Sequence, residues 1–388
     1  MNLNELLLQI GTNAIVQPNK YLQPGHNGPY RDPETSVRNF GHWLITFSKC
    51  YKWTGDNRFK DKVVELAEHL CSEKSRPYGY SFHHRNKTDK DKCNGLIGQA
   101  WTFEALGEAS RLLEVRRFEK LAEDVFFQHP FDGKIGLWNR LEIDGRVLSV
   151  DSTFNHQLWF AACSSLIQSE EKDEIMSRIT RFLDCLKHNL SVLKNGLVYH
   201  PIEHLFDAHM QTQHRVSNQV KKWFMHILSA IRTGAWAKEA KNYEQAKAEI
   251  RGKIVSKSIG YHCFNMYGFA LLKQSIPTHA LWNSEKFTKM VDYMLTEEYN
   301  NGVNDNPFGY PYNPPGFEVP YALSVLKPMA RSELLRTCSR WVNEQVKRCY
   351  NEETQMMDRN TEDSVTHSAR IYEAGRLEDW LLQSIRVS

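Results

Sequence analysis

The sequence predicts an all-α fold of the (α/α)6 toroid kind, with six or seven helical hairpins in one domain over residues 1–388. Two observations lead to this prediction. Helical hairpins recur about every 50–60 residues, and in each hairpin one helix is apolar nearly all round while its partner is amphipathic. A hairpin that cannot bury its own apolar faces must pack on its neighbours. Six or seven of them in 388 residues match a ring that closes on itself.

The first predicted hairpin joins helices over residues 35–54 and 57–73. Between them, Thr54-Gly55-Asp56 provides a glycine that ends one helix and an aspartate that caps the next. Apolar side chains repeat at helical spacing in the first of these helices, at Val37, Phe40, Trp43, Leu44, Phe47 and Tyr51. An aromatic loop that contains His83 and His84 follows the hairpin.

The same arrangement repeats along the rest of the chain. Helices 94–114 and 151–167 are apolar nearly all round, so we expect them inside the ring, and each is followed by an amphipathic partner. The predicted pairs are 94–114 with 116–129, 151–167 with 169–192, 214–234 with 237–256, 262–274 with 284–299, 317–329 with 331–350, and 364–385 with 3–15. Loops between pairs reach about 20 residues, and long loops on a rigid scaffold commonly carry function.

The composition is that of an ordinary globular protein, and it excludes several classes of partner. Lys and Arg number 49 and Asp and Glu 46, so the net charge of +3 excludes nucleic-acid binding driven by bulk positive charge. No apolar run is long enough to span a membrane, and the first residues lack the basic segment of a signal peptide. We expect a cytoplasmic protein, whose oligomeric state the sequence leaves open.

The eight cysteines are scattered singly, and no two of them form a Cys-x-x-Cys pair. Because several lie within apolar helical runs, we expect buried, reduced thiols rather than disulfides. A polar cluster matches no standard zinc spacing, and it consists of His200, Glu203, His204, Asp207 and His209. The sequence therefore predicts neither a metal site nor a cofactor.

Asp151 is the first candidate catalytic residue. It lies at the first turn of the predicted inner helix 151–167, where an aspartate often only caps the helix. Asn155, His156 and Trp159 follow closely in the same helix. A carboxylate, an amide, an imidazole and an indole at the mouth of a buried helix suit a sugar-binding site better than a cap alone.

The run Asp151-x-x-x-Asn155-x-x-Leu158-x-x-Ala161 resembles the signature helix of the unsaturated glucuronyl and unsaturated rhamnogalacturonyl hydrolases, which are six-hairpin α/α toroids. The stretch Gly196-Leu-Val-Tyr-His200 resembles one that is common in the rhamnogalacturonyl branch. The resemblance implies that Asp151 is the general acid/base and protonates a carbon–carbon double bond, to which water adds. The chain departs from these hydrolases at Asn94, where they carry a second aspartate, and at 214–224, where their Trp- and Gly-rich helix start is missing. The layout is more distantly similar to sugar 2-epimerases and uronyl epimerases.

Other residues in the long loops are candidate sugar ligands. Trp138 and Arg140 precede Asp151, and an exposed tryptophan beside an arginine could stack on a pyranose and pair with a uronate. Glu318 opens a late inner helix and is the candidate partner carboxylate, although the helix dipole alone also favours a glutamate there. The predicted binding residues are Asn94, Trp138, Arg140, Asn155, His156, His83, His84, His200 and Trp159. If the ring closes, an anionic sugar could also meet Arg31, Arg38, Arg359 and Arg370.

Three functions stay open at this stage. The first is a glycoside hydrolase-like enzyme that acts on an acidic, uronate-containing oligo- or polysaccharide, with Asp151 as general acid/base. The second is an epimerase or lyase on the same fold, with acid/base groups on opposite faces of the sugar ring supplied by Asp151 with Glu318 or a loop histidine. The third is a non-catalytic glycan-binding or assembly protein, which Asn94 in place of an aspartate favours.

Overall fold

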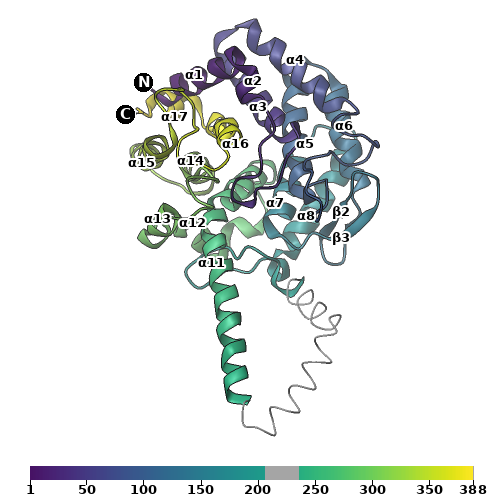
Figure 1. Cartoon of the computed structure of the whole chain (residues 1–388), viewed down its shortest axis with the longest axis vertical. Coiled ribbons are helices and arrows are strands. Elements are labelled where there is room, and N and C mark those ends of the chain that lie inside the picture. The colour runs from purple at the N-terminus through teal and green to yellow at the C-terminus, as the bar shows by residue number, and fades with distance from the viewer. Residues whose placement is uncertain (206–235, 388) are drawn as a thin grey trace.

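The computed structural model describes residues 1–205 and 236–387, and within them six inner elements form a closed ring (Figure 1). Each inner element contacts the next, and the last contacts the first. This ring confirms the prediction of an all-α toroid. The inner elements are α3 (Val37–Thr54), α5 (Gly95–Leu113), α7 (Phe154–Ser164), the C-terminal part of α11 (Trp236–Ser275), α14 (Pro315–Leu326) and the 3₁₀ helix η3 (Arg370–Arg376).

A second layer of helices packs around this ring. In order along the chain, α4 packs on α3, α6 on α5, α8 on α7, α13 on α11 and α15 on α14, while α1 packs on η3. The bounds of these helices are α1 (Leu3–Val16), α4 (Asn57–Cys71), α6 (Arg116–Gln128), α8 (Lys172–Asn189), α13 (Glu297–Asn304) and α15 (Arg331–Cys349). Shorter helices complete the described chain: α2 (Pro18–Tyr21), η1 (Gly28–Tyr30), η2 (Ala280–Asn283), α12 (Glu285–Tyr293), α16 (Ser364–Ala369) and α17 (Asp379–Ser384).

The two layers differ in burial in the way that the sequence predicts. α5 and α7 are buried on all faces over most of their length. In contrast, α6 buries one stripe that includes Phe118, Ala122 and Val125 and exposes its opposite face. A helix that is apolar all round must be surrounded by other elements. The placement of 94–114 and 151–167 inside the ring is therefore confirmed.

The two ends of the chain lie side by side and complete the ring (Figure 1). The backbone N–H of Leu3 donates to the carbonyl of Ile385 at 3.0 Å, and that of Val387 donates to the carbonyl of Met1 at 2.9 Å. The predicted pairing of the first helix with the last part of the chain is confirmed. The predicted helix 364–385 is, however, divided into α16, η3 and α17.

Residues 237–256 and 262–274, predicted as two helices, belong to the single helix α11, whose N-terminal half projects from the ring (Figure 1). Gly260, which falls between the two predicted helices, does not interrupt α11. A Cβ at this position would lie 2.5 Å from Cβ of Phe308, so the glycine allows two segments to approach closely. The predicted helix 214–234 lies outside the described residues.

Residues 284–299, predicted as one helix, form α12 and the start of α13. The side chain of Thr296 accepts a hydrogen bond from the backbone N–H of Tyr299 at 3.1 Å and so caps a new helix. The predicted loop 130–150 also differs, because it contains a small antiparallel sheet with the order β1-β2-β3. Its strands are β1 (Phe131–Asp132), β2 (Leu137–Leu141) and β3 (Val147–Val150).

All eight cysteines are free thiols, and seven of them are buried. In the parts of the chain that the structure describes, no helix combines the length and the apolar character needed to cross a membrane. The cytoplasmic location stays a prediction.

Candidate active site

A cavity of about 130 Å³ lies at the end of the ring where α5 and α7 begin. We call it the inner cavity. It adjoins a larger space of about 570 Å³, the outer chamber. The two share four lining residues, Arg85, Lys90, Thr153 and His156. A molecule bound in the inner cavity can therefore extend past His156 into the outer chamber.

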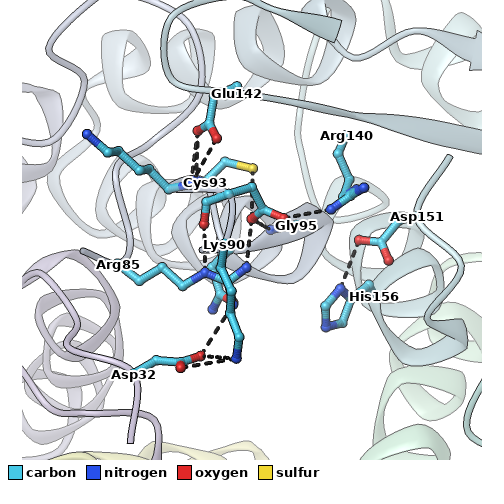
Figure 2. Close-up of polar contacts among 12 residues, drawn as sticks. Asp32, Arg85, Lys90, Cys93, Gly95, Arg140, Glu142, Asp151 and His156 are labelled. Carbon is cyan, nitrogen blue, oxygen red and sulfur yellow. Dashed lines mark hydrogen bonds and ion pairs between the residues drawn. The ribbon is translucent and has the colours of Figure 1, made fainter. Parts of the chain in front are cut away.

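Asp151 and His156 form a hydrogen-bonded pair between these two spaces. Nδ1 of His156 lies 2.8 Å from Oδ2 of Asp151 (Figure 2). Strand β3 ends at Val150 and α7 begins at Phe154, so the carboxylate meets the first turn of the helix that carries the imidazole. The same carboxylate accepts the backbone N–H of Leu96 at 3.2 Å and that of Thr153 at 3.1 Å.

Asp151 is ionised at neutral pH although it is almost fully buried. Burial alone would raise the pKa of Asp151, but the hydrogen bond and charge of His156, the charge of Arg140 and the N–H of Leu96 together lower this pKa to about 2. An ionised carboxylate accepts the Nδ1 proton of the imidazole and leaves Nε2 available for proton transfer. Asp151 thus acts on His156 and is a poor proton donor by itself.

Gly95 makes room for this pair at the start of α5. Its φ is +59°, and a Cβ there would lie 2.6 Å from Oδ2 of Asp151 and 2.7 Å from Nδ1 of His156. Asn94, just before it, also has a positive φ of 56°, and its Oδ1 accepts a hydrogen bond from Arg85 at 2.9 Å. The backbone at the mouth of α5 is therefore shaped so that the carboxylate and imidazole can approach it.

His200 brings a second imidazole to the inner cavity. Its backbone N–H donates to Oγ of Ser258 at 3.0 Å, and its ring centroid lies 4.7 Å from that of Tyr261. Burial, with Lys257 and His156 nearby, holds the pKa of His200 well below its usual value. His200 is therefore neutral at physiological pH and can accept a proton.

Three buried polar atoms of residues that line the inner cavity have no hydrogen-bond partner within the described residues: Nη2 of Arg38, Oδ1 of Asn155 and Nδ1 of His200. Buried polar groups are almost always paired, so these three atoms are available to form hydrogen bonds with a polar ligand in the cavity. The set offers a cationic donor, an amide acceptor and an imidazole, which suits a molecule rich in hydroxyl groups.

Aromatic side chains from three distant segments form one wall of this cavity. Tyr30 and Tyr261 are linked by their hydroxyls at 2.8 Å, and the hydroxyl of Tyr312 donates to Oδ1 of Asn27 at 2.8 Å. On another side, the guanidinium of Arg38 lies 4.1 Å from the ring centroid of Trp101. Flat aromatic faces beside polar groups are suited to a sugar ring.

Most of the positive charges around the two spaces have a carboxylate partner (Figure 2). Asp32 lies 2.8 Å from Nζ of Lys90 and 3.5 Å from Arg85. Asp91 lies 2.9 Å from Arg85 and 2.7 Å from Arg140. These pairs hold the loop before α5 against the small sheet.

The structure brings together a part of the residues that the sequence predicts for the site. Asn94, Asn155, His156 and His200 line the inner cavity, and Arg140, Asp151 and His156 line the outer chamber. Of the four arginines expected near an anionic sugar, Arg38 and Arg370 line the inner cavity. Arg31 and Arg359 do not line either space: Arg31 pairs with Glu362 and Arg359 binds backbone carbonyls.

Trp138 departs from its expected exposure. Its side chain is fully buried, with its ring centroid 4.6 Å from that of Phe131 and 5.4 Å from that of Phe160. The small sheet and the outer helices enclose the indole, so it cannot stack on a bound sugar. The expectation of an exposed Trp138 is corrected accordingly.

Trp159, His84 and His83 also lie outside both spaces. Trp159 is fully buried and donates from Nε1 to the carbonyl of Phe264 at 3.0 Å, behind the cavity wall. His84 is fully buried, with Nε2 at 3.1 Å from Oγ1 of Thr102. Burial lowers the pKa of His84 to about 3, and it also lowers that of His83. A direct contact of these side chains with a ligand in the described cavity is not possible without rearrangement.

Glu318 is fully buried beneath the cavity lining. Its Oε1 accepts from Nη2 of Arg370 at 2.5 Å, and Arg370 also binds Glu373 at 2.7 Å. Arg370, and not Glu318, reaches the inner cavity. The structure thus places Glu318 as a buried partner of an arginine and outside the lining of both spaces, which disagrees with the expectation of a second catalytic carboxylate.

Sequence reasoning missed several lining residues, above all Tyr30, Asp32, Lys90, Lys257 and Tyr261. Tyr30 and Asp32 flank Arg31, which the sequence placed near an anionic sugar, so a local signal existed for these two residues alone. Of the polar cluster that matches no zinc spacing, His200, Glu203 and His204 are described, and Asp207 and His209 lie outside the described residues. Within those residues, no group of His, Cys, Asp and Glu is arranged to hold a metal.

Comparison with known proteins places this site in context. No protein-family model matches the chain. The archaeal glycosylation protein Q of Haloferax volcanii is 40% identical over 361 residues, which cover 92% of this chain and 92% of that protein. Among solved structures, the cellobiose 2-epimerase of Bacillus thermoamylovorans B4167 has a TM-score of 0.61 at 12% identity, with 96% of this chain and 98% of that chain covered.

A second solved structure is the α-1,6-mannanase of Salegentibacter sp. HEL1_6 in an inactive variant, with a TM-score of 0.53 at 12% identity and coverage of 96% of this chain and 98% of that chain. At these identities the two structures establish a shared toroid and nothing about the reaction. One of them is an epimerase and the other a hydrolase, so the choice between reactions depends on the site itself.

Proposed function

The chain belongs to the family of the archaeal glycosylation protein Q, and from this premise we propose that it is a sugar-modifying enzyme that epimerises or isomerises an acidic sugar by proton transfer. The observation that carries the proposal is the hydrogen bond of 2.8 Å between Asp151 and His156, in a space that His200 also lines. Two imidazoles at one cavity can remove and return a proton at a carbon next to a carbonyl group.

The two imidazoles differ in their surroundings, and this difference suggests their roles. His200 is neutral because burial and Lys257 lower its pKa, so it is suited to remove the proton. His156 donates its Nδ1 hydrogen to Asp151, which orients the ring and leaves Nε2 as the atom that returns a proton to the substrate. In the reverse direction the roles exchange, and no proton is gained or lost over the cycle.

The intermediate of such a reaction carries a negative charge on the carbonyl oxygen. The unpaired Nη2 of Arg38 is the donor suited to stabilise it, since a fixed cation in a buried site costs no reorganisation during the reaction. Arg38 is itself held by Glu34 at 3.0 Å and by Oδ1 of Asn27 at 3.0 Å. Its position is therefore set before a substrate binds.

The same site supports an oligosaccharide as the substrate. The inner cavity suits one sugar ring, and the outer chamber begins at His156, where a linked sugar could continue. The acidic character of the substrate is supported by the number of cations that line the cavity, which are Arg38, Arg85, Lys90, Lys257 and Arg370.

A second candidate is hydration of an unsaturated uronyl sugar, because the run from Asp151 to Ala161 resembles that of the unsaturated uronyl hydrolases. In that reaction His156 would have to supply the proton, since Asp151 is ionised at neutral pH. Loss of the ultraviolet absorbance of the substrate's conjugated double bond would favour this candidate over the epimerase.

The test is incubation of the purified protein with D-glucuronate, D-galacturonate, D-glucose and D-mannose, free and as disaccharides, in D₂O. We expect deuterium at the carbon next to the carbonyl group and, with it, a second epimer or isomer in the NMR spectrum. Binding of a sugar without exchange or conversion would contradict the enzymatic proposal and favour a glycan-binding protein.

A further inference from the structure

Lys257 is a cation of the inner cavity that lies among several aromatic rings. It lies on α11 where this helix reaches the ring. Its Nζ is 4.9 Å from the ring centroid of Tyr30, 5.6 Å from that of Tyr261 and 5.8 Å from that of Phe308. We call these three rings the aromatic box. An ammonium group among aromatic faces is held in place by cation–π attraction.

Lys257 also has no carboxylate within ion-pair distance among the residues for which the structure gives side chains. The other cations that line the inner cavity are all paired: Arg38 with Glu34, Arg85 and Lys90 with Asp32, and Arg370 with Glu318 and Glu373. A half-buried ammonium without a counter-ion is costly. Burial and the charge of Lys90 accordingly lower the pKa of Lys257 to about 8. An anionic ligand would remove this cost.

The hydroxyls of Tyr30 and Tyr261 in the box, and of the neighbouring Tyr312, are already engaged in hydrogen bonds within the chain. Oδ1 of Asn27 can only accept, so the hydroxyl of Tyr312 donates its one proton to it at 2.8 Å. The hydroxyl of Tyr261 donates to that of Tyr312 at 3.5 Å, and the hydroxyls of Tyr30 and Tyr261 share a hydrogen bond of 2.8 Å. These hydroxyls thus bond to one another and to Asn27, whereas the ammonium of Lys257 carries a positive charge toward the cavity. On this side of the cavity, Lys257 is the donor for an anion.

We propose that Lys257 is the specificity-determining residue of this site: its ammonium binds the carboxylate of an acidic sugar, so the protein selects a uronic acid over the neutral sugar of the same stereochemistry. This inference rests on the proposed function in that it takes the inner cavity to hold a sugar ring. A single ammonium matches the single charge of a carboxylate, whereas a phosphate dianion would leave a charge unmatched.

The experiment measures binding by calorimetry at pH 7 for D-glucuronate, D-galacturonate, D-glucose, D-galactose and glucose 6-phosphate. The variants are Lys257→Met, which keeps the stem, and Lys257→Arg, which keeps the charge. The control is Lys253→Met, because Lys253 lies one turn earlier on α11, is exposed and pairs with Glu249 at 2.7 Å. Circular dichroism and the unfolding temperature establish that each variant is folded.

We expect the wild type to bind a uronate at least about tenfold more tightly than the matching neutral sugar, as expected when a charged hydrogen bond is gained. Lys257→Met should lose this preference by weakening uronate binding alone, Lys257→Arg should keep most of it, and Lys253→Met should equal the wild type.

Three other results would contradict the proposal, and each contradicts a different part of it. A uronate preference that survives in folded Lys257→Met overturns the role of Lys257 and leaves the proposed function intact. A wild type that binds neutral sugars as tightly as uronates, or glucose 6-phosphate more tightly than either, overturns the proposed recognition of a carboxylate. A wild type that binds none of these sugars overturns the proposed function and the inference with it.

Discussion

Oδ2 of Asp151 accepts the hydrogen of Nδ1 of His156 at 2.8 Å, and this contact assigns different tasks to the two residues. The carboxylate is kept ionised, with a pKa of about 2, so it accepts the Nδ1 hydrogen and orients the imidazole. The imidazole is a quarter exposed and lines both spaces of the site, so it is the member of the pair that can reach a substrate.

Asp151→Asn should lower kcat by about 10²- to 10⁴-fold, the range that a positioned acid/base group contributes. An amide can present its NH₂ to Nδ1 and so favour the wrong tautomer of His156. The fold should persist, because asparagine has the same shape as aspartate and its Oδ1 can still accept the backbone N–H of Thr153. The measurement is steady-state kinetics together with an unfolding temperature, and activity within a few-fold of the wild type would leave Asp151 only its structural contacts with the backbone of Leu96 and Thr153.

His200→Gln should separate hydrogen exchange from epimerisation. If His200 and His156 serve opposite faces of the sugar, the variant keeps the base for one epimer only. In D₂O that epimer should still exchange its proton through His156, while conversion to the other epimer falls by about 10²- to 10⁴-fold. His156→Gln should show exchange with the opposite epimer. Loss of both activities with both epimers in His200→Gln would argue against two separate bases.

Uronate binding should weaken as the pH rises through about 8. Lys257 is charged below its pKa, which burial and Lys90 lower to about 8, while the carboxylate of the sugar stays ionised throughout. The groups that face it do not titrate in this range: burial raises the pKa of Tyr30 and Tyr261 well above their usual value and lowers that of His200. Lys90 is paired with Asp32.

Bound uronate favours the charged form of Lys257. The midpoint of the plot of affinity against pH should therefore lie somewhat above the pKa of Lys257 in the free protein. Dissociation constants measured between pH 6.5 and 9.5, a range of about three pH units around the transition, test this prediction. Lys257→Arg should give a flat profile over the same range. A wild-type profile that is equally flat would contradict the participation of Lys257.

Glu318→Ala should destabilise the fold by about 3 kcal/mol, because removing one partner from a buried ion pair leaves a charge uncompensated. Arg370 would keep only Glu373 as a carboxylate partner. The control is Glu362→Ala, since Glu362 pairs with Arg31 at the exposed surface and should contribute less than about 1 kcal/mol. Urea unfolding measures both. Unchanged stability with lost activity would instead support the catalytic role that the sequence suggests for Glu318.

Sequence patterns predicted the hairpins well, because the buried face of a helix requires apolar residues at every third or fourth position. They failed where packing overrides local signals. Residues 237–256 and 262–274 were predicted as separate helices, but α11 continues through Gly260, which is a point of close approach to Phe308. Residues 130–150 have turn-like composition and still pair as strands, which encloses Trp138.

The site was predictable to the extent that it is local in sequence. Asp151, Asn155 and His156 lie within one turn and a half of one helix start, so their spacing was informative. The aromatic box joins Tyr30, Lys257 and Phe308, which lie far apart in the chain and meet only because the ring closes. The low pKa of Asp151 likewise depends on Arg140 and Leu96, whose proximity no local pattern reveals.

Gly95→Ala should inactivate the enzyme through the Asp151–His156 pair. The added Cβ would lie 2.6 Å from Oδ2 of Asp151 and 2.7 Å from Nδ1 of His156, so at least one of these groups must move. A displacement of about 1 Å in a catalytic group can lower the rate by about 10²-fold. The positive φ of +59° adds backbone strain of about 1–2 kcal/mol for any residue with a Cβ.

Gly55→Ala separates these two effects. Gly55 has a similar φ of +67°, and a Cβ there would meet nothing within 4 Å, so its substitution carries the strain without the collision. We expect both variants to lose comparable stability in urea unfolding, apart from any cost of the collision, and only Gly95→Ala to lose activity. Equal activity in the two variants would show that the site tolerates displacement of the Asp151–His156 pair. This result would contradict the role of His156 as the residue that carries the proton.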